Sequence, residues 1–168
     1  MPEQVIINSI EFARNSESLH GKVQVESLDR LRDLLFSNSG ALEYTLTGKR
    51  DGDGKFFLTC IIKGVLQLRC QRCLGAFSYP VSLDSELELV EHDPDLAAEH
   101  GLTDAIKADP NMDVLALVED EVLLDLPMAP MHSPEDCQAG GNFGQTKTVK
   151  QNAFSALAAL KTQDSRKI

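Results

Sequence analysis

The chain has 168 residues, of which 42% are hydrophobic and 25% charged, and its formal net charge is −10. This length fits one domain that buries a core without disulfides. No apolar run approaches the ~18 residues of a membrane span, and the first residues lack the basic and apolar regions of a signal peptide. Four cysteines without such a signal predict reduced thiols, no membrane partner and a cytoplasmic location.

Charge is unevenly distributed along the chain. Residues 48–79 contain six basic and two acidic side chains, whereas residues 83–138, the acidic belt, contain sixteen acidic side chains and one basic. Phosphate binding needs clustered cations, so the first stretch suits a nucleic acid and the acidic belt repels one. The alternative is that both stretches are solvated faces without a partner.

The N-terminal third gives mixed signals, and residues 6–25 are ambiguous between helix and strand. Ser27 is an N-cap candidate for a short helix that ends near Asn38, because leucines follow it at helical spacing. These leucines are Leu28, Leu31, Leu34 and Leu35.

Residues 42–90 predict an antiparallel meander. Apolar and alternating runs occur at 42–47, 56–62, 65–69, 77–81 and 83–90. A turn rich in Asp and Gly at 51–54 is typical of a hairpin, and Gly64 predicts the next break. The segment between residues 69 and 77 is then the tip of a second hairpin.

The acidic belt contains one clear helix. Asp113 is predicted to cap it and Pro127 to end it, after a turn-rich, exposed connection at 92–112. Its apolar stripe is Leu115, Val118, Val122 and Leu126, and the side chains predicted to face water are Asp120, Glu121 and Asp125. A Gly-rich linker and a short helix at 153–161, capped by Asn152, follow.

Three cysteines and one histidine form two half-sites. Cys70 and Cys73 make a C-x2-C pair, and His132 and Cys137 follow about sixty residues later. Thiolate and imidazole are the ligands that tetrahedral zinc prefers, and four of them leave no open position, which predicts a structural ion. The alternative is two reduced, partly exposed cysteines and a surface histidine. Cys60, in an apolar run, is predicted to be a buried thiol.

Catalytic motifs are absent from the sequence. A thioredoxin-like thiol pair opens a helix, whereas strand-like sequence follows Cys73. The chain has neither G-x-S-x-G nor H-E-x-x-H. We therefore expect a protein that is not an enzyme and has no small-molecule substrate.

Cations and aromatic side chains surround the C-x2-C pair. Arg69 and Arg72 lie next to and within it, Lys63 precedes it and Tyr79 follows it, close to Phe77. Cations beside aromatic rings on a hairpin suit single-stranded RNA, whose bases stack and whose phosphates pair. The alternative is core aromatic side chains beside solvated arginines.

The chain resembles the YceD family, which is named for large ribosomal RNA subunit accumulation. The matching stretches are L-R-C-Q-R-C-L at 68–74 with Phe77, D-V-L-A-L-V-E-D-E at 113–121 with L-D-L-P at 124–127, P-M-H at 130–132 with D-C at 136–137, and N-A-F at 152–154 with L-K at 160–161. The resemblance covers most of the chain from about Leu66 onward, and the joint pattern is specific.

The resemblance implies a non-enzymatic cytoplasmic factor that promotes synthesis, processing or stability of large-subunit (23S) rRNA. Its expected partner is this rRNA or a pre-ribosomal particle. Members richer in cysteine carry thiols around His132 and Cys137, and a Cys-for-His exchange there preserves a zinc ligand. The rival hypothesis is an adaptor whose acidic belt binds a basic ribosomal protein or assembly factor.

Together these patterns predict an α+β fold. We expect a curved antiparallel sheet with the helix after Asp113 packed on it and a short C-terminal helix. Residues 1–138 are predicted to form one domain, and residues 139–168 the linker and the last helix.

Overall fold

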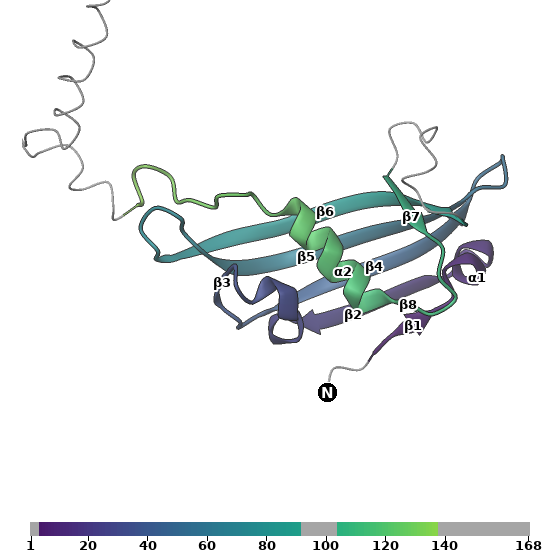
Figure 1. Ribbon diagram of the computed structural model, residues 1–168, viewed down its shortest axis with the longest axis horizontal. Coiled ribbons are helices and arrows are strands. Elements are labelled where there is room, and N and C mark those ends of the chain that lie inside the picture. The colour runs from purple at the N-terminus through teal and green to yellow at the C-terminus, as the bar shows by residue number, and fades with distance from the viewer. Residues whose placement is uncertain (1–3, 92–103, 138–168) are drawn as a thin grey trace, which may run out of the picture. The chain divides into compact units, whose positions relative to one another are not determined.

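The computed structural model describes residues 4–91 and 104–137 (Figure 1). The elements in chain order are β1 (Ile6–Ile7), α1 (Ser9–Arg14), β2 (Ser18–Gln24), the 3-10 turns η1 (Val25–Ser27) and η2 (Asp29–Leu31), β3 (Leu35–Ser37), β4 (Ala41–Arg50), β5 (Phe56–Arg69), β6 (Ala76–Val90), β7 (Asp104–Lys107), β8 (Met112–Asp113) and α2 (Val114–Asp125).

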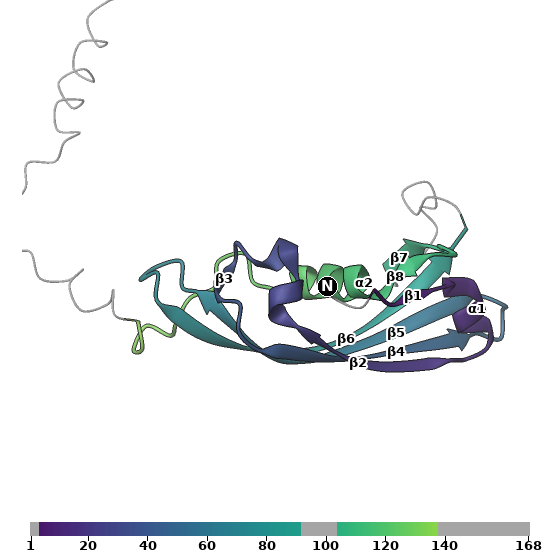
Figure 2. The same ribbon diagram turned by 90° about the horizontal axis from the view of Figure 1, so that it is seen from below.

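The main sheet has the order β2-β4-β5-β6-β7, and β3 pairs with β5 at one end. All pairings are antiparallel except that between β6 and β7. β1 and β8 form a separate two-stranded ribbon. Figure 2 shows the sheet curving around the side that carries α2, η1 and η2. The predicted α+β fold, with a curved and mostly antiparallel sheet and a helix packed after it, is confirmed.

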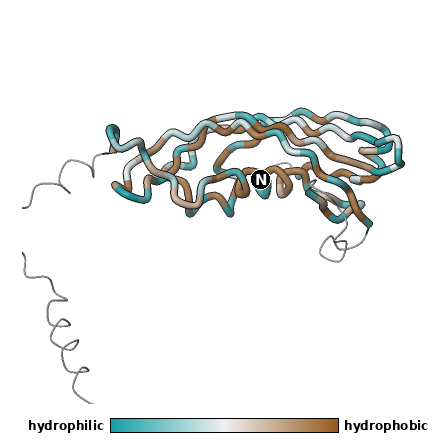
Figure 3. Tube along the Cα trace, turned by 90° about the horizontal axis from the view of Figure 1, so that it is seen from above, coloured by the Kyte–Doolittle hydropathy of each residue, from teal (hydrophilic) through white to brown (hydrophobic). Residues whose placement is uncertain are grey.

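The core lies between the sheet and α2. Leu46 of β4 and Leu58 and Ile62 of β5 are fully buried and belong to the same core cluster as Val118 and Val122 of α2. Figure 3 shows hydrophobic residues interspersed along the strands and along the helix that lies over the sheet. Successive side chains of a strand point to opposite faces of the sheet. The residues next to Leu46, Leu58 and Ile62 in sequence therefore point away from α2, to the face called here the open face.

The helix predicted after Ser27 is wrong. The chain forms two 3-10 turns and then β3, which pairs with β5 through Leu35 and Ser37. Leu28, Leu31 and Leu35 still enter the core. Pairing with β5 satisfies backbone groups that a single helical turn leaves free, so tertiary contacts override the local leucine spacing.

The break predicted at Gly64 is also wrong, because β5 runs through it. A Cβ atom at this position would lie 2.5 Å from the Leu42 side chain, so glycine permits close packing here and does not end the strand. The runs at 77–81 and 83–90 likewise join into the single strand β6. The turn predicted at 51–54 is confirmed, with Gly54 at φ +84°.

The connection predicted at 92–112 is wrong at its second half. Residues Asp104–Lys107 extend the sheet as β7, and Met112 and Asp113 pair with β1. Residues 92–103 and 138–168 lie outside the described part of the chain, and with them the linker, the C-terminal helix and the domain boundary at 138. These stay predictions. Among the residues that the structure does describe, no helix is long and apolar enough to span a membrane.

Helix α2 begins where the sequence predicts. The Asp113 side chain accepts hydrogen bonds from the N–H groups of Leu115 and Ala116, at 2.9 and 3.4 Å. The prediction for its polar face is partly wrong, since Glu121 is only 7% exposed. Leu124, one turn later, is 82% exposed.

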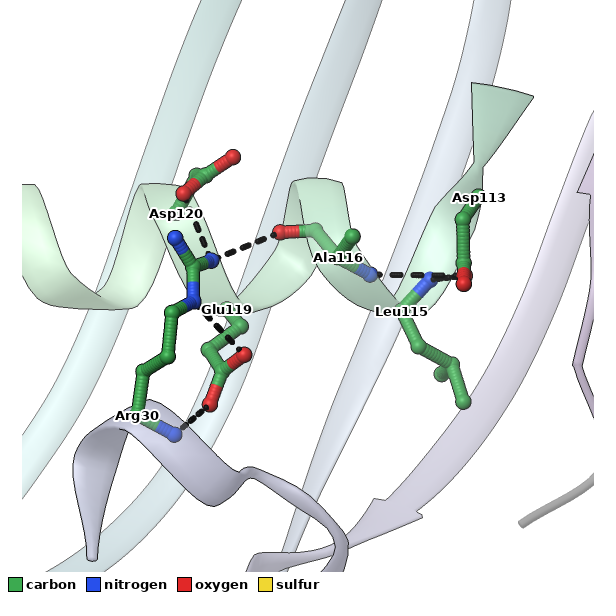
Figure 4. A network of polar contacts seen from close by, with 6 residues as sticks. All are labelled: Arg30, Asp113, Leu115, Ala116, Glu119 and Asp120. Carbon is green, nitrogen blue, oxygen red and sulfur yellow. Dashed lines mark hydrogen bonds and ion pairs between the residues drawn. The ribbon is translucent and has the colours of Figure 1, made fainter. Parts of the chain in front are cut away.

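A charged network joins η2 to α2 (Figure 4). The Arg30 backbone N–H and Nε donate to the two carboxylate oxygens of Glu119 at 2.7 and 3.0 Å, and the same guanidinium pairs with Asp120 at 2.6 Å. The Glu119 carboxylate, followed by that of Asp120, raises the pKa of Arg30. The network fixes η2 over the helix, although the 3-10 turn itself has few internal hydrogen bonds.

Candidate metal centre

The first half-site lies at the tip of the β5–β6 hairpin, as predicted. The Cys70 N–H donates to the Gly75 carbonyl at 3.0 Å, and the Leu74 N–H donates to the Cys70 carbonyl at 2.9 Å. This tight turn places Leu74 at φ +62°, a left-handed conformation that a residue with a side chain adopts at a cost. Because β6 follows the turn, the thiols do not open a helix as a thioredoxin-like pair does.

The second half-site is on the loop after α2. The Pro130 carbonyl accepts a hydrogen bond from the Gln71 N–H at 2.8 Å, which holds the loop against the hairpin tip. The Ser133 hydroxyl donates to the Asp136 carboxylate at 2.6 Å and accepts from its N–H at 3.3 Å. The turn formed by Ser133 and Asp136 presents Cys137 toward the hairpin. Its S-x-x-D pattern is a turn signal that the sequence does carry.

The two half-sites converge. The ligand atoms of Cys70, Cys73, His132 and Cys137 all lie within 4.8 Å of one another, the one such group of metal-ligating side chains in residues 4–91 and 104–137. Cys70 Sγ is 4.0 Å from Cys137 Sγ, and Cys73 Sγ is 3.4 Å from His132 Nδ1. Zn–S bonds of about 2.3 Å in a tetrahedron separate two sulfurs by about 3.8 Å, so the spacing suits one zinc ion.

The hydrogen bond of His132 selects its free nitrogen. Nε2 lies 2.7 Å from the Ala76 carbonyl oxygen, which can only accept, so Nε2 carries the proton. Nδ1 then directs its lone pair at the sulfurs. The ring also packs edge-on against Phe77, with centroids 5.5 Å apart. Sequence patterns give no signal for the Ala76 carbonyl, because any residue supplies one.

The thiol pKa values of Cys70 and Cys73 indicate how the cluster would be charged. Burial opposes ionisation of Cys70, but N–H groups of the surrounding loops, those of Cys73 and His132 first, lower the pKa of the Cys70 thiol to about 5. The Gly75 N–H favours a thiolate at Cys73, yet burial and the two neighbouring thiols raise the pKa of Cys73 overall. Thiolates at this spacing repel one another, so their joint ionisation needs positive charge nearby, which a metal ion would supply.

His132 responds to the same charges. The Cys70 side chain, followed by the Ala76 carbonyl, raises the pKa of His132. A thiolate-rich donor set, a histidine with its second nitrogen fixed, and burial of Cys70 and Cys137 together fit zinc. The ion would have a structural role, since the four side chains fill a tetrahedral shell.

Arg72 belongs to this cluster. Its Nε donates to Cys137 Sγ at 3.0 Å, and its terminal nitrogen donates to the carbonyl oxygens of His132 and Ser133 at 3.3 and 3.4 Å. Three thiolates and a neutral imidazole around Zn²⁺ would carry a net charge of −1, which the guanidinium would balance. Arg72 therefore positions the second half-site and does not extend freely into solvent.

The other residues predicted to bind RNA lie on two faces. Lys63 and Arg69 are exposed on the open face of β5. Tyr79 points to the opposite side, where its hydroxyl donates to the Asp125 carboxylate at 3.4 Å. The structure thus brings Lys63 and Arg69 to one surface, places Tyr79 on the opposite side and holds Arg72 in the Cys/His cluster. Cys60 is fully buried as predicted, and burial raises its pKa to about 12.

Comparisons with known proteins find one family and no solved structure. The family model described as "Large ribosomal RNA subunit accumulation protein YceD" matches residues 58–161, a region that contains all four candidate ligands. A protein of that same name from Haemophilus influenzae is 24% identical over 163 residues, covering 92% of this chain and 94% of the relative. No solved structure matches the chain.

Proposed function

The chain belongs to the YceD family of large ribosomal RNA subunit accumulation proteins, and on this premise we propose that it is a non-enzymatic cytoplasmic factor that promotes accumulation of 23S rRNA. The observation that supports a binding role is the Cys/His cluster, whose four ligands leave no position for a substrate. A structural ion at the hairpin tip rigidifies a surface and does no chemistry itself.

Zinc is the first element of the proposal. Metal analysis of reduced, untagged protein should give about one zinc per chain, since the four ligand atoms already lie at the spacing of a tetrahedral site. Less than about a tenth of an equivalent, after purification without chelators, would contradict the zinc centre.

Direct contact with rRNA is the second element. The strand segments that end at the hairpin tip, residues 35–37, 64–69 and 76–81, contain no acidic residue in a chain of net charge −10. Arg69 is exposed there, Lys63 lies at its border, and Phe36 of β3 is half exposed. A ring that stacks bases beside two cations is a common platform for single-stranded RNA.

Crosslinking in cells, followed by sequencing of the bound RNA, tests this contact. We expect reads concentrated on precursor 23S rRNA, and a large loss of these reads for Lys63→Glu with Arg69→Glu, because both changes leave the metal cluster intact. The matched control is Lys49→Glu with Lys107→Glu, which reverses the same charge at the far end of the sheet.

The rival function is that of an adaptor for a basic ribosomal protein or assembly factor. It is favoured if crosslinked reads stay at background while deletion of the protein still depletes 23S rRNA. An unchanged read profile for the Lys63→Glu, Arg69→Glu variant would contradict RNA contact through the surface of Phe36, Lys63 and Arg69.

A further inference from the structure

A groove runs along the outer edge of β6, beside the last turns of α2. It encloses about 480 Å³ and is lined by residues 83–86, Asp104, Glu121, Leu124 and Asp125. β7 pairs with β6 only from Leu87 to Val90. Within the described chain, residues 83–86 therefore pair with β5 on one side and with no strand on the other. The outward N–H and C=O groups of such a segment are those with which an added strand pairs.

The described residues that line the groove include five carboxylates and no cation. They come from β6, β7 and α2, and they are Asp84, Glu86, Asp104, Glu121 and Asp125. Two have weak partners elsewhere: Lys49 lies 3.8 Å from Glu86, and the Tyr79 hydroxyl lies 3.4 Å from Asp125. The remaining negative charge faces the groove.

Glu121 is the most telling residue of the groove. It is only 7% exposed, yet no hydrogen bond or ion pair to its side chain occurs among the residues that the structure describes. No side-chain oxygen in that part of the chain is both buried and unpartnered, so the Glu121 carboxylate keeps its solvent contact at the groove. A carboxylate that is mostly removed from water and unpaired favours a cationic occupant.

The arrangement of the carboxylates does not match a single metal ion as that occupant. In residues 4–91 and 104–137, only the Cys/His cluster brings three or more ligand atoms together. The groove carboxylates are instead spread along a strand edge, and the exposed Leu124 adds an apolar contact. Spread anionic charge beside free backbone groups matches a chain with repeated cations.

We propose that this groove binds an extended Lys- and Arg-rich segment of a partner protein, which adds to β6 as a strand. Its backbone would pair with residues 83–86, a length of about 13 Å. Side chains directed toward α2 would meet Glu121 and Asp125, and those directed toward the open face would meet Asp84 and Glu86. The site requires neither zinc nor RNA contact, so its test is independent of the proposed function.

A labelled octapeptide of alternating Lys and Val tests the site on the full chain by fluorescence anisotropy. We expect saturable binding, and slower hydrogen exchange at residues 83–86 in the complex. A Glu–Val peptide should not bind. A Lys–Pro peptide has the same charge but lacks a continuous row of N–H donors, so it should bind at least about tenfold more weakly. Equal binding of the Lys–Val and Lys–Pro peptides would overturn strand addition.

Two variants locate the binding. Glu121→Gln with Asp84→Asn removes two groove charges with little change of shape, and should weaken Lys–Val binding about tenfold. The control, Glu26→Gln with Asp33→Asn, removes the same charge at exposed positions outside the groove and should change it less than about twofold. Equal losses would show diffuse attraction to an acidic protein and overturn the site.

Leu124→Lys supplies a test without risk to folding, because this side chain is exposed. It places a cation in the groove and should abolish binding of the Lys–Val peptide. Undiminished binding to this variant would likewise overturn the proposal.

Discussion

The body of the sheet and the hairpin tip are ordered by different forces. Between the sheet and α2, fully buried Leu, Ile and Val side chains pack together. At the tip, Leu74 and Met131 are exposed, and only Pro130 and Cys137 are buried in the loop at 128–137. The tip thus lacks an apolar core, and convergence of four ligands takes its place. Stability of the body and order of the tip should therefore respond to different changes.

The largest effect is expected in the body. Leu58→Ala removes a fully buried side chain and should lower the free energy of unfolding by about 3 kcal/mol, with zinc content unchanged. Denaturant unfolding followed by circular dichroism measures the first quantity, and metal analysis of the folded variant the second. Loss of zinc from folded Leu58→Ala protein would show that the two regions are not separate.

A matched pair of cysteine substitutions sharpens the comparison. Cys137→Ser should weaken zinc binding by at least about 100-fold, equivalent to about 2.7 kcal/mol, because serine is a poor zinc ligand. Hydrogen exchange should then accelerate at residues 70–76 and 128–137, and not in β4. Cys60→Ser, in the buried body, should do the reverse by lowering stability while zinc is kept.

Arg72→Gln isolates the support of the tip. The variant loses the charged donor to Cys137 Sγ but keeps all four ligands, so zinc affinity should fall about tenfold. Competition with a chromophoric chelator measures the affinity. Arg69→Gln is the control, because its exposed side chain is outside the cluster, and it should leave the affinity unchanged. Equal zinc affinity in both variants would contradict a role of Arg72 in supporting the metal centre.

The smallest effect is expected at Leu74. Glycine adopts the left-handed φ of this position without steric cost, and the leucine side chain is 63% exposed. Leu74→Gly should therefore stabilise the zinc-bound tip by about 0.5–1 kcal/mol, seen as slower hydrogen exchange at residues 70–76. Faster exchange would mean that the apolar contact of Leu74 outweighs its backbone strain.

The sequence by itself determined the features that depend on local chemistry. Alternating residues indicate strands within residues 42–90, although not that β5 and β6 are continuous. Asp113 indicates the start of α2, and the spacing of Cys70 and Cys73 selects a tight turn. The four ligand types also indicate a metal site of the kind that zinc prefers before their positions are known, because ligand preference is a property of the side chains.

Tertiary structure decided what depends on partners far along the chain. The leucine spacing after Ser27 is compatible both with a helix and with the 3-10 turns that occur. The end of β5 that β4 leaves without a partner favours the turns, because β3 can then pair with it. The sequence shows that Glu121 is charged, but only the position of β6 beside α2 decides that this side chain is buried at the groove. Arg72 is basic in either environment, but only convergence of the loop at 128–137 assigns its guanidinium to Cys137. Contacts of this kind close loops of tens of residues, and local patterns contain no record of them.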